Sequence, residues 1–161
     1  MKRFLAMWLL FVMSASLFVA AENNAQSAFD KMKSLDGTWV GKSPEGKPAE
    51  VSFRTTSGGS ALMSEIKGDE DMITMFHMDG DRLLMTHYCG SGNQPRMAGT
   101  LSPDGKSVTF NFVDATNLAS PETGHMHKVT FTMPDSSRHS EEWVFLDHGK
   151  EMTEHFELTR K

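Results

Sequence analysis

The chain of 161 residues contains very little cysteine, since Cys89 is the only one. A single thiol cannot form an internal disulfide, so a disulfide-linked scaffold is excluded and a hydrophobic core has to stabilise the fold. We expect Cys89 to be a buried, unreactive thiol. A reactive thiol or an intermolecular disulfide is the alternative.

The sequence also lacks basic clusters and the common catalytic motifs. No run of Lys and Arg with interleaved aromatic residues occurs, so we expect neither nucleic acid nor an anionic membrane surface as a partner. Glycine patterns that cradle phosphates or dinucleotides are absent, and so is the nucleophile elbow of hydrolases. We therefore expect a binding protein rather than an enzyme.

Long apolar runs are missing too, apart from one at the start of the chain. Two basic residues precede the apolar run Phe4–Met13, and the small residues of Val19–Ala21 follow it. This pattern predicts a cleavable signal peptide over 1–21, with cleavage after Ala20 or Ala21. A transmembrane helix, the alternative, needs about 20 apolar residues, and this run is interrupted by serines and ends at Glu22.

Cleavage would leave an exported protein, periplasmic or secreted, without stable membrane insertion. No later segment is apolar enough to span a membrane. Segment 1–21 carries two of the 16 basic residues and none of the 21 acidic ones, so the net charge of the remaining 140 residues is −7. That length is sufficient for one domain with one core, and it leaves the oligomeric state open.

Turn-forming residues recur at intervals of about 8–12 residues after Gly37, a spacing typical of all-β sandwiches and barrels. Nine turns separate ten strand-sized segments, and a meander of short strands avoids exposed edges by closing on itself. We predict an all-β, closed, antiparallel up-and-down barrel of about ten strands with a short N-terminal helix over Ala28–Leu35. The expected parts are the signal peptide 1–21, a leader and short helix 22–36, and the barrel domain 37–161, with a helical turn at Asn117–Ala119 in the longest connection.

Side chains alternate between the two faces of a strand, so a period of two assigns the interior. In the last hairpin, closed by His148-Gly149, two carboxyl groups face inward, and a buried carboxylate needs a partner. We expect one to pair with Arg160 or Arg96 and the other to reach a histidine or a water, with acid–base work as the alternative. The inward residues of this hairpin are Glu141, Trp143, Phe145, Met152, Glu154 and Phe156.

The segment Phe29–Trp39 and the C-terminal Arg160 together resemble the calycin superfamily, which includes lipocalins and fatty-acid-binding proteins. These proteins begin with a short helix and a Gly-x-Trp on the first strand, here Gly37 and Trp39, and a basic residue of the last strand packs across the Trp. The resemblance implies a lipocalin-like barrel in which Trp39 plugs one end and Arg160 stacks on its ring. The whole mature chain also resembles a group of uncharacterised exported bacterial proteins.

Alternate turns of an up-and-down meander lie at the same end, and the end opposite the plug receives the unusual polar segments. We expect binding residues there, because loops at one end of a rigid barrel commonly carry them. By the period of two, His125 and His127 share the inward face of their strand, and Met126 points away. The predicted ligand-binding residues of this rim are His87, Tyr88, Asn93, Gln94, Arg96, Asn117, His125 and His127.

The leading hypothesis is an exported protein that takes a largely apolar small molecule through this His-rich rim. The alternative is a Zn or Cu site, with or without a metal-dependent activity, built on His87, His125 and His127 with Glu154 nearby. In the simpler interpretation these histidines only hydrogen-bond to loop carbonyls. A third hypothesis is a structural or interaction domain whose rim loops contact another protein.

Overall fold

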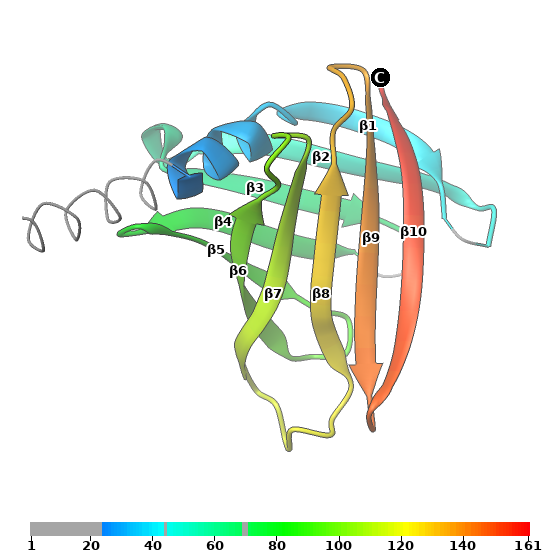
Figure 1. Cartoon of the computed structure of the whole chain (residues 1–161). Helices are drawn as coiled ribbons and strands as arrows, with labels where there is room; N and C mark the ends of the chain where they lie inside the picture. Colours follow the sequence, from blue (N-terminus) through cyan, green and yellow to red (C-terminus); the bar gives the residue numbers. More distant parts are fainter. Residues whose placement is uncertain (1–23, 44, 69–70) are drawn as a thin grey trace, which may run out of the picture.

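Ten antiparallel strands form a closed up-and-down barrel in the computed structural model, which describes residues 24–43, 45–68 and 71–161 (Figure 1). Each strand pairs with its neighbours in the chain, and β1 closes the barrel on β10, which confirms the predicted architecture. The signal peptide and its cleavage site lie outside the described residues. The strands are β1 Gly37–Lys42, β2 Pro48–Thr56, β3 Ala61–Lys67, β4 Met72–Asp79, β5 Arg82–Tyr88, β6 Gln94–Leu101, β7 Ser107–Thr116, β8 His125–Thr132, β9 Arg138–Asp147 and β10 Lys150–Arg160.

A short helix, residues 24–33, precedes the barrel, a few residues earlier than the predicted range. Its buried residues Ala25, Ala28, Phe29 and Met32 follow the i, i+3, i+4, i+7 spacing of one helix face, so the helix packs this stripe on the barrel. The helix lies beside the upper end of the barrel in Figure 1. Within the described ranges, no helix is long and apolar enough to cross a membrane.

Aromatic side chains fill the middle of the barrel. Phe131 lies at the centre of this cluster and contacts Phe53, Phe76, Phe110 and Trp143, with ring centres 5.8–6.3 Å apart. All five rings are no more than 3% exposed, and the four pairs with Phe131 are edge-to-face, a favourable arrangement for aromatic rings. This aromatic cluster therefore fills the middle of the barrel.

The hairpin between β9 and β10 has the predicted register. Asp147 pairs with Lys150 around the two-residue turn, and Trp143 and Glu141 pair with Glu154 and Phe156. The prediction for the longest connection was wrong, because β7 runs on to Thr116 and residues 117–124 form bends and turns without a helix.

A β-bulge in β8 overturns the predicted orientation of its first residues. Met126 pairs with Phe145 and Lys128 with Val144, so His127 is the extra residue between them. Met126 is therefore 9% exposed and belongs to the hydrophobic core, whereas His125 pairs with Leu146 on the opposite face. One inserted residue reverses the faces of everything beyond it, and the period of two cannot reveal such an insertion.

Candidate functional site

The closed end of the barrel is held by Trp39 and Arg160, in the contact that the calycin resemblance implies. The Arg160 guanidinium lies 4.2 Å from the centre of the Trp39 ring, and Trp39 Nε1 donates to the Leu35 carbonyl at 2.7 Å. Arg160 also donates to the carbonyls of Ser34, Asp36 and Ser136 at 2.6–2.9 Å. These hydrogen bonds connect Arg160 to the residues after the helix and to the β8–β9 turn, and the ring contact connects it to β1.

Glu141 is 1% exposed and has two hydrogen-bonding partners inside the barrel. Trp143 Nε1 donates to one carboxyl oxygen at 2.9 Å, and His139 Nε2 lies 3.0 Å from the other. The predicted partners, Arg160 and Arg96, are engaged elsewhere: Arg96 pairs with Asp114 on the outer face of the barrel, where this contact lowers the pKa of Asp114. A histidine or a water was expected for the second of the two inward carboxyl groups. His139 is such a partner for Glu141, although the sequence analysis did not single it out.

His87 lies in the barrel interior and not at the rim, which corrects the prediction. Ser64, Thr74 and His87 occupy paired positions on β3, β4 and β5, and all three are buried. Thr74 Oγ1 lies 2.9 Å from His87 Nδ1, and the ring packs 4.9 Å from Trp143. Burial lowers the pKa of His87 to about 4, so the imidazole is neutral at ordinary pH. Its Nε2 is buried without a hydrogen-bonding partner among the described residues.

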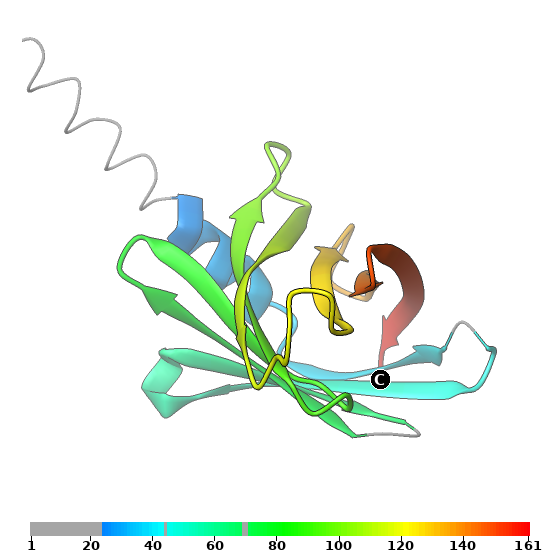
Figure 2. The ribbon, with the colours of Figure 1, turned by 90° about the horizontal axis from the view of Figure 1, so that it is seen from below.

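An open recess of about 470 Å³ lies next to this polar layer, at the end of the barrel away from Trp39. Inward-facing residues at the open ends of β2, β3, β4 and β10 line the recess. On β3 and β4 these are Ile66 and Met72, the next inward-facing residues after Ser64 and Thr74. Figure 2 shows β8–β10 (yellow to red) facing β2–β5 (cyan to green) across this end. We call this space the open-end recess; its lining is Ser43, Glu45, Lys47, Pro48, Ala49, Ile66, Lys67, Gly68, Met72, Glu154 and Phe156.

Glu154 is the carboxyl group that β10 presents to the open-end recess. Burial, and then the charge of nearby Glu45, raises its pKa. Lys47 and Lys67 line the same space, so the recess combines charges of both signs with apolar walls. The sequence prediction placed Glu154 inward but assigned it to a metal site, and it did not select the apolar residues of this lining.

A second space of about 490 Å³ lies where β7 and β8 diverge beyond the pair Asn111 and Lys128. Phe112 packs against His125 and His127, with ring centres at 4.6 and 5.5 Å, and the two imidazoles are 5.6 Å apart. We call this space the histidine pocket; its lining is Phe112, Val113, Asp114, Ala115, Leu118, Ala119, Ser120, Pro121, His125, His127 and Leu146.

The two histidines of this pocket differ in their hydrogen bonds. His125 is 3% exposed, and its Nδ1 lies 2.7 Å from the Thr123 carbonyl, which can only accept. Nδ1 of His125 therefore carries the proton, which in the neutral ring leaves Nε2 as the acceptor. The Nδ1 of His127 is buried with no partner in the described part of the chain. The hydrogen bond to a loop carbonyl is what the simpler interpretation of these histidines expected.

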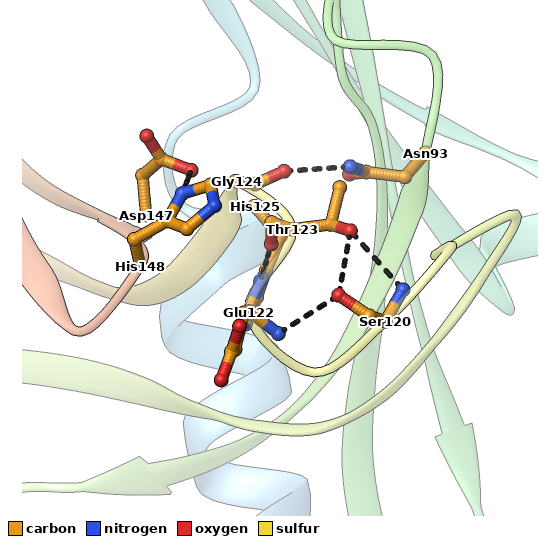
Figure 3. Close-up of polar contacts among 8 residues, drawn as sticks. All are labelled: Asn93, Ser120, Glu122, Thr123, Gly124, His125, Asp147 and His148. Carbon is orange, nitrogen blue, oxygen red and sulfur yellow. Dashed lines mark hydrogen bonds and ion pairs between the residues drawn. The ribbon is translucent and has the colours of Figure 1, made fainter.

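Several predicted rim residues hold the loops together. Asn93 Nδ2 donates to the Gly124 carbonyl at 2.8 Å, and Asn117 Nδ2 donates to the Gly92 carbonyl at 2.6 Å. Thr116 Oγ1 donates to Gln94 Oε1 at 2.8 Å. Figure 3 shows that Asn93 reaches the connection 117–124 from the neighbouring loop.

Within that connection, Ser120 and Thr123 bond to each other's backbone and side chains, and the backbone N–H of Glu122 donates to Ser120 Oγ at 3.3 Å (Figure 3). The backbone N–H of His148 donates to the Glu122 carbonyl at 3.0 Å, which ties the connection to the β9–β10 turn. Most of the polar groups named in this region therefore form hydrogen bonds within the protein.

The residues of the predicted metal site are not brought together. His87 is enclosed beside Trp143, His125 and His127 lie against Phe112, and Glu154 lines the open-end recess. Across the described ranges, no group of three or more His, Cys, Asp or Glu is placed to hold a metal ion. The two causes are the bulge at His127 and the deep position of His87 on β5.

The remaining candidates, Tyr88 and Cys89, lie at the end of β5. Tyr88 is 50% exposed, and it pairs across the strands with Ile73, which is 38% exposed. Cys89 is half-buried, packs against the hydrophobic core, and accepts a hydrogen bond from Ser91 Oγ at 3.1 Å. Neither side chain lines the open-end recess or the histidine pocket.

No family model and no curated protein sequence matches this chain. Among solved structures, it is similar to a protein of unknown function from the DUF3598 family of Nostoc punctiforme PCC 73102, with a TM-score of 0.56 and 11% identity. That match covers 80% of this chain and 48% of the other, so the chain spans about half the length of the Nostoc protein.

Rv2717c from M. tuberculosis is also similar, with a TM-score of 0.55 and 16% identity over 83% of this chain and 96% of its own. At these identities the likeness concerns the fold alone. It agrees with a closed barrel of ten antiparallel strands, an architecture consistent with a calycin-like fold.

Proposed function

We propose that this protein binds a small, largely apolar molecule in the open-end recess. One observation carries the proposal: aromatic side chains fill the middle of the barrel, and at one end inward-facing residues line an open space of about 470 Å³. Ligand pockets commonly measure about 300–1,000 Å³ and combine apolar walls with a few polar groups. The mouths of β-barrels are among their usual places.

The lining indicates what kind of molecule would fit. Ala49, Ile66 and Phe156 offer apolar contact to the body of a ligand, and Glu154 offers a carboxyl group to its polar end. Because the pKa of Glu154 is raised, its carboxyl group keeps its proton up to a higher pH than that of an ordinary Glu. It can then donate a hydrogen bond as well as accept one. An amphiphilic molecule with one polar end would meet both parts of the lining.

The proposal is tested with the dye 1-anilinonaphthalene-8-sulfonate, titrated by fluorescence into the purified protein. We expect binding of about one dye per chain, weakened at least tenfold by Phe156→Asp, which places a charge in the apolar wall. The matched control is Val113→Asp, at an exposed apolar position of the histidine pocket, and it should leave the affinity unchanged. Weakening by Val113→Asp alone would move the site to the histidine pocket and reject the open-end recess.

The proposed place of action is outside the cytoplasm, on the evidence of the N-terminal sequence alone. Cleavage after Ala20 or Ala21 predicts that the mature protein begins at Ala21 or Glu22. N-terminal sequencing of the protein from the cells that make it tests this directly. A mature chain that still begins at Met1 would contradict export by this route.

A further inference from the structure

Over more than half of its length, one edge of β10 has no strand partner among the residues that the structure describes. On one side, β10 pairs with β9 from Lys150 through Thr159. On the other side, β1 pairs only with Glu157–Arg160, four residue pairs in all. No described residue forms backbone hydrogen bonds with the remaining edge, Lys150–Phe156. Figure 1 shows the lower half of β10 (red) with β9 on one side only.

The backbone groups along this free edge are known from the register. Asp147 and Lys150 flank a two-residue turn and form its hydrogen-bonded pair, so the even-numbered residues of β10 bond to β9. The backbone N–H of Arg160 fits this alternation, since it donates to Ser137, and that of Lys161 donates to Thr38 of β1. The N–H and C=O groups of Glu151, Thr153 and His155 therefore point away from β9, toward the side of β10 on which β1 pairs with Glu157–Arg160. Such a row is a template for another strand.

The side chains along this edge are complementary to those of the same edge in a second copy. In an antiparallel pairing of two copies with Thr153 opposite Thr153, Glu151 of each copy lies opposite His155 of the other on the outer face. All three positions are exposed. His155 Nε2 lies 2.7 Å from Glu157 of its own chain, so its Nδ1 is the ring atom that remains for a hydrogen bond to Glu151 of the other copy. Thr–Thr pairs stabilise adjacent strands as well. On the inner face, Met152, which is 46% exposed, lies opposite Glu154 of the other copy.

From this self-complementarity we infer that a second copy of this chain pairs with the free edge of β10. The dimer is two-fold symmetric, with the residues Lys150–Phe156 of both copies in one continuous sheet. Three hydrogen-bonded residue pairs form, centred on Thr153. The second copy covers the exposed Met152 and extends the sheet at the point where β1 ends.

The dimer also bears on the proposed ligand site. Glu154 and Phe156 line the open-end recess from β10, so Met152 of the second copy lies at the rim of that recess, opposite Glu154. This consequence rests on the proposed function, but the dimer itself does not. Dye binding and self-association are separate measurements, so failure of one is distinguishable from failure of the other.

Sedimentation velocity of the purified protein over a range of concentrations tests the dimer. We expect a reversible monomer–dimer equilibrium. Thr153→Lys places two like charges opposite each other and should raise the dimer dissociation constant roughly tenfold at low salt. Thr153→Pro removes a backbone donor from the free edge only, and it should also favour the monomer. Thr130→Lys, at a half-buried Thr of β8 away from this edge, is the control and should leave the equilibrium unchanged.

A charge exchange makes the test specific for the register. Glu151→Lys and His155→Glu should each weaken the dimer several-fold, and the double variant should restore it, because a Lys and a Glu then lie opposite each other in both pairs. A protein that stays monomeric at every concentration would overturn the inference, even if the free edge binds an extended segment of another protein. A dimer that Thr153→Lys and Thr153→Pro leave intact would overturn it as well.

Discussion

Among single residues, Glu141 shows how a carboxyl group is accommodated in an aromatic interior. It lies beside Phe131 on the paired strand and is 1% exposed, yet both carboxyl oxygens have partners, Trp143 and His139. His139 in turn packs edge-on against Trp39 at 4.3 Å. Two hydrogen-bonding contacts and this ring contact therefore connect the middle of the barrel to its closed end, and each oxygen of the Glu141 carboxyl has a partner.

Replacing Glu141 by Ala should lower the free energy of unfolding by about 3 kcal/mol, because Trp143 and His139 lose their acceptor in a buried place. Glu141→Gln retains an acceptor oxygen and should cost less. Urea denaturation monitored by Trp fluorescence gives the values. Glu142→Ala, at the exposed neighbouring position, is the control and should stay within about 0.5 kcal/mol of the wild type. Equal effects of the Glu141 and Glu142 variants would contradict this role.

His87 predicts a pH dependence of stability. Its pKa falls from 6.5 to about 4 on folding because of burial, so the unfolded chain binds a proton between these values and the folded protein does not. The contribution of neutral His87 is therefore complete above pH 6.5 and is lost as the pH falls toward 4. The total loss amounts to roughly 3 kcal/mol.

The variant His87→Phe should flatten the pH dependence of the unfolding free energy between pH 7 and pH 4 relative to the wild type. Urea denaturation at several pH values measures this difference, and it does not require equal stability at pH 7. His155→Gln, at an exposed position of β10, should keep the wild-type slope. If wild type and His87→Phe lose the same free energy over this range, His87 is not the titrating group.

Among the elements of the fold, the last hairpin and β8 show what local sequence does and does not determine. His148 and Gly149 both have positive φ, 48° and 74°, which gives the tight turn expected of a two-residue hairpin and fixes its register. The register assigned Glu141 and Trp143 correctly to the interior. In β8 the same reasoning failed, because the extra residue His127 carries no turn signal and the bulge depends on the neighbouring strands.

His148 is strained by its positive φ, since residues with a Cβ seldom adopt that region. Asn tolerates it better and is preferred before Gly in such turns. The variant His148→Asn should therefore raise the free energy of unfolding by roughly 0.5 kcal/mol, measured by thermal or urea denaturation. Gly149→Ala, at the other positive φ, should lower it. A destabilised His148→Asn variant would show that the contact between His148 and Asp147 outweighs the backbone strain.

For the whole molecule, the ten strands, their order and the closure by β1 and β10 were predictable, because turn spacing and alternation are local properties of the sequence. The contact of Trp39 with Arg160 followed from the calycin resemblance. The candidate site was less predictable. Polar residues gathered at the open end as expected, but Asn93, Asn117 and Gln94 bond to the loops there.

The open-end recess depends on where β1 stops, at Lys42, while β10 continues beyond it. Because of that difference in strand length, Glu154 and Phe156 face open space. The sequence around these two residues does not indicate where β1 ends. The same difference leaves the edge of β10 unpaired. One feature of the whole barrel thus underlies both the proposed ligand site and the proposed dimer.

Ligand binding in the open-end recess can be tested by mapping the bound dye on the protein itself. Amide chemical shifts of the ¹⁵N-labelled protein would be followed by NMR during a titration with 1-anilinonaphthalene-8-sulfonate. Binding in the open-end recess predicts that the largest changes fall on Ala49, Ile66, Met72 and Phe156, which line it. Changes confined to Phe112, His125 and His127, or no saturable changes at all, would contradict it.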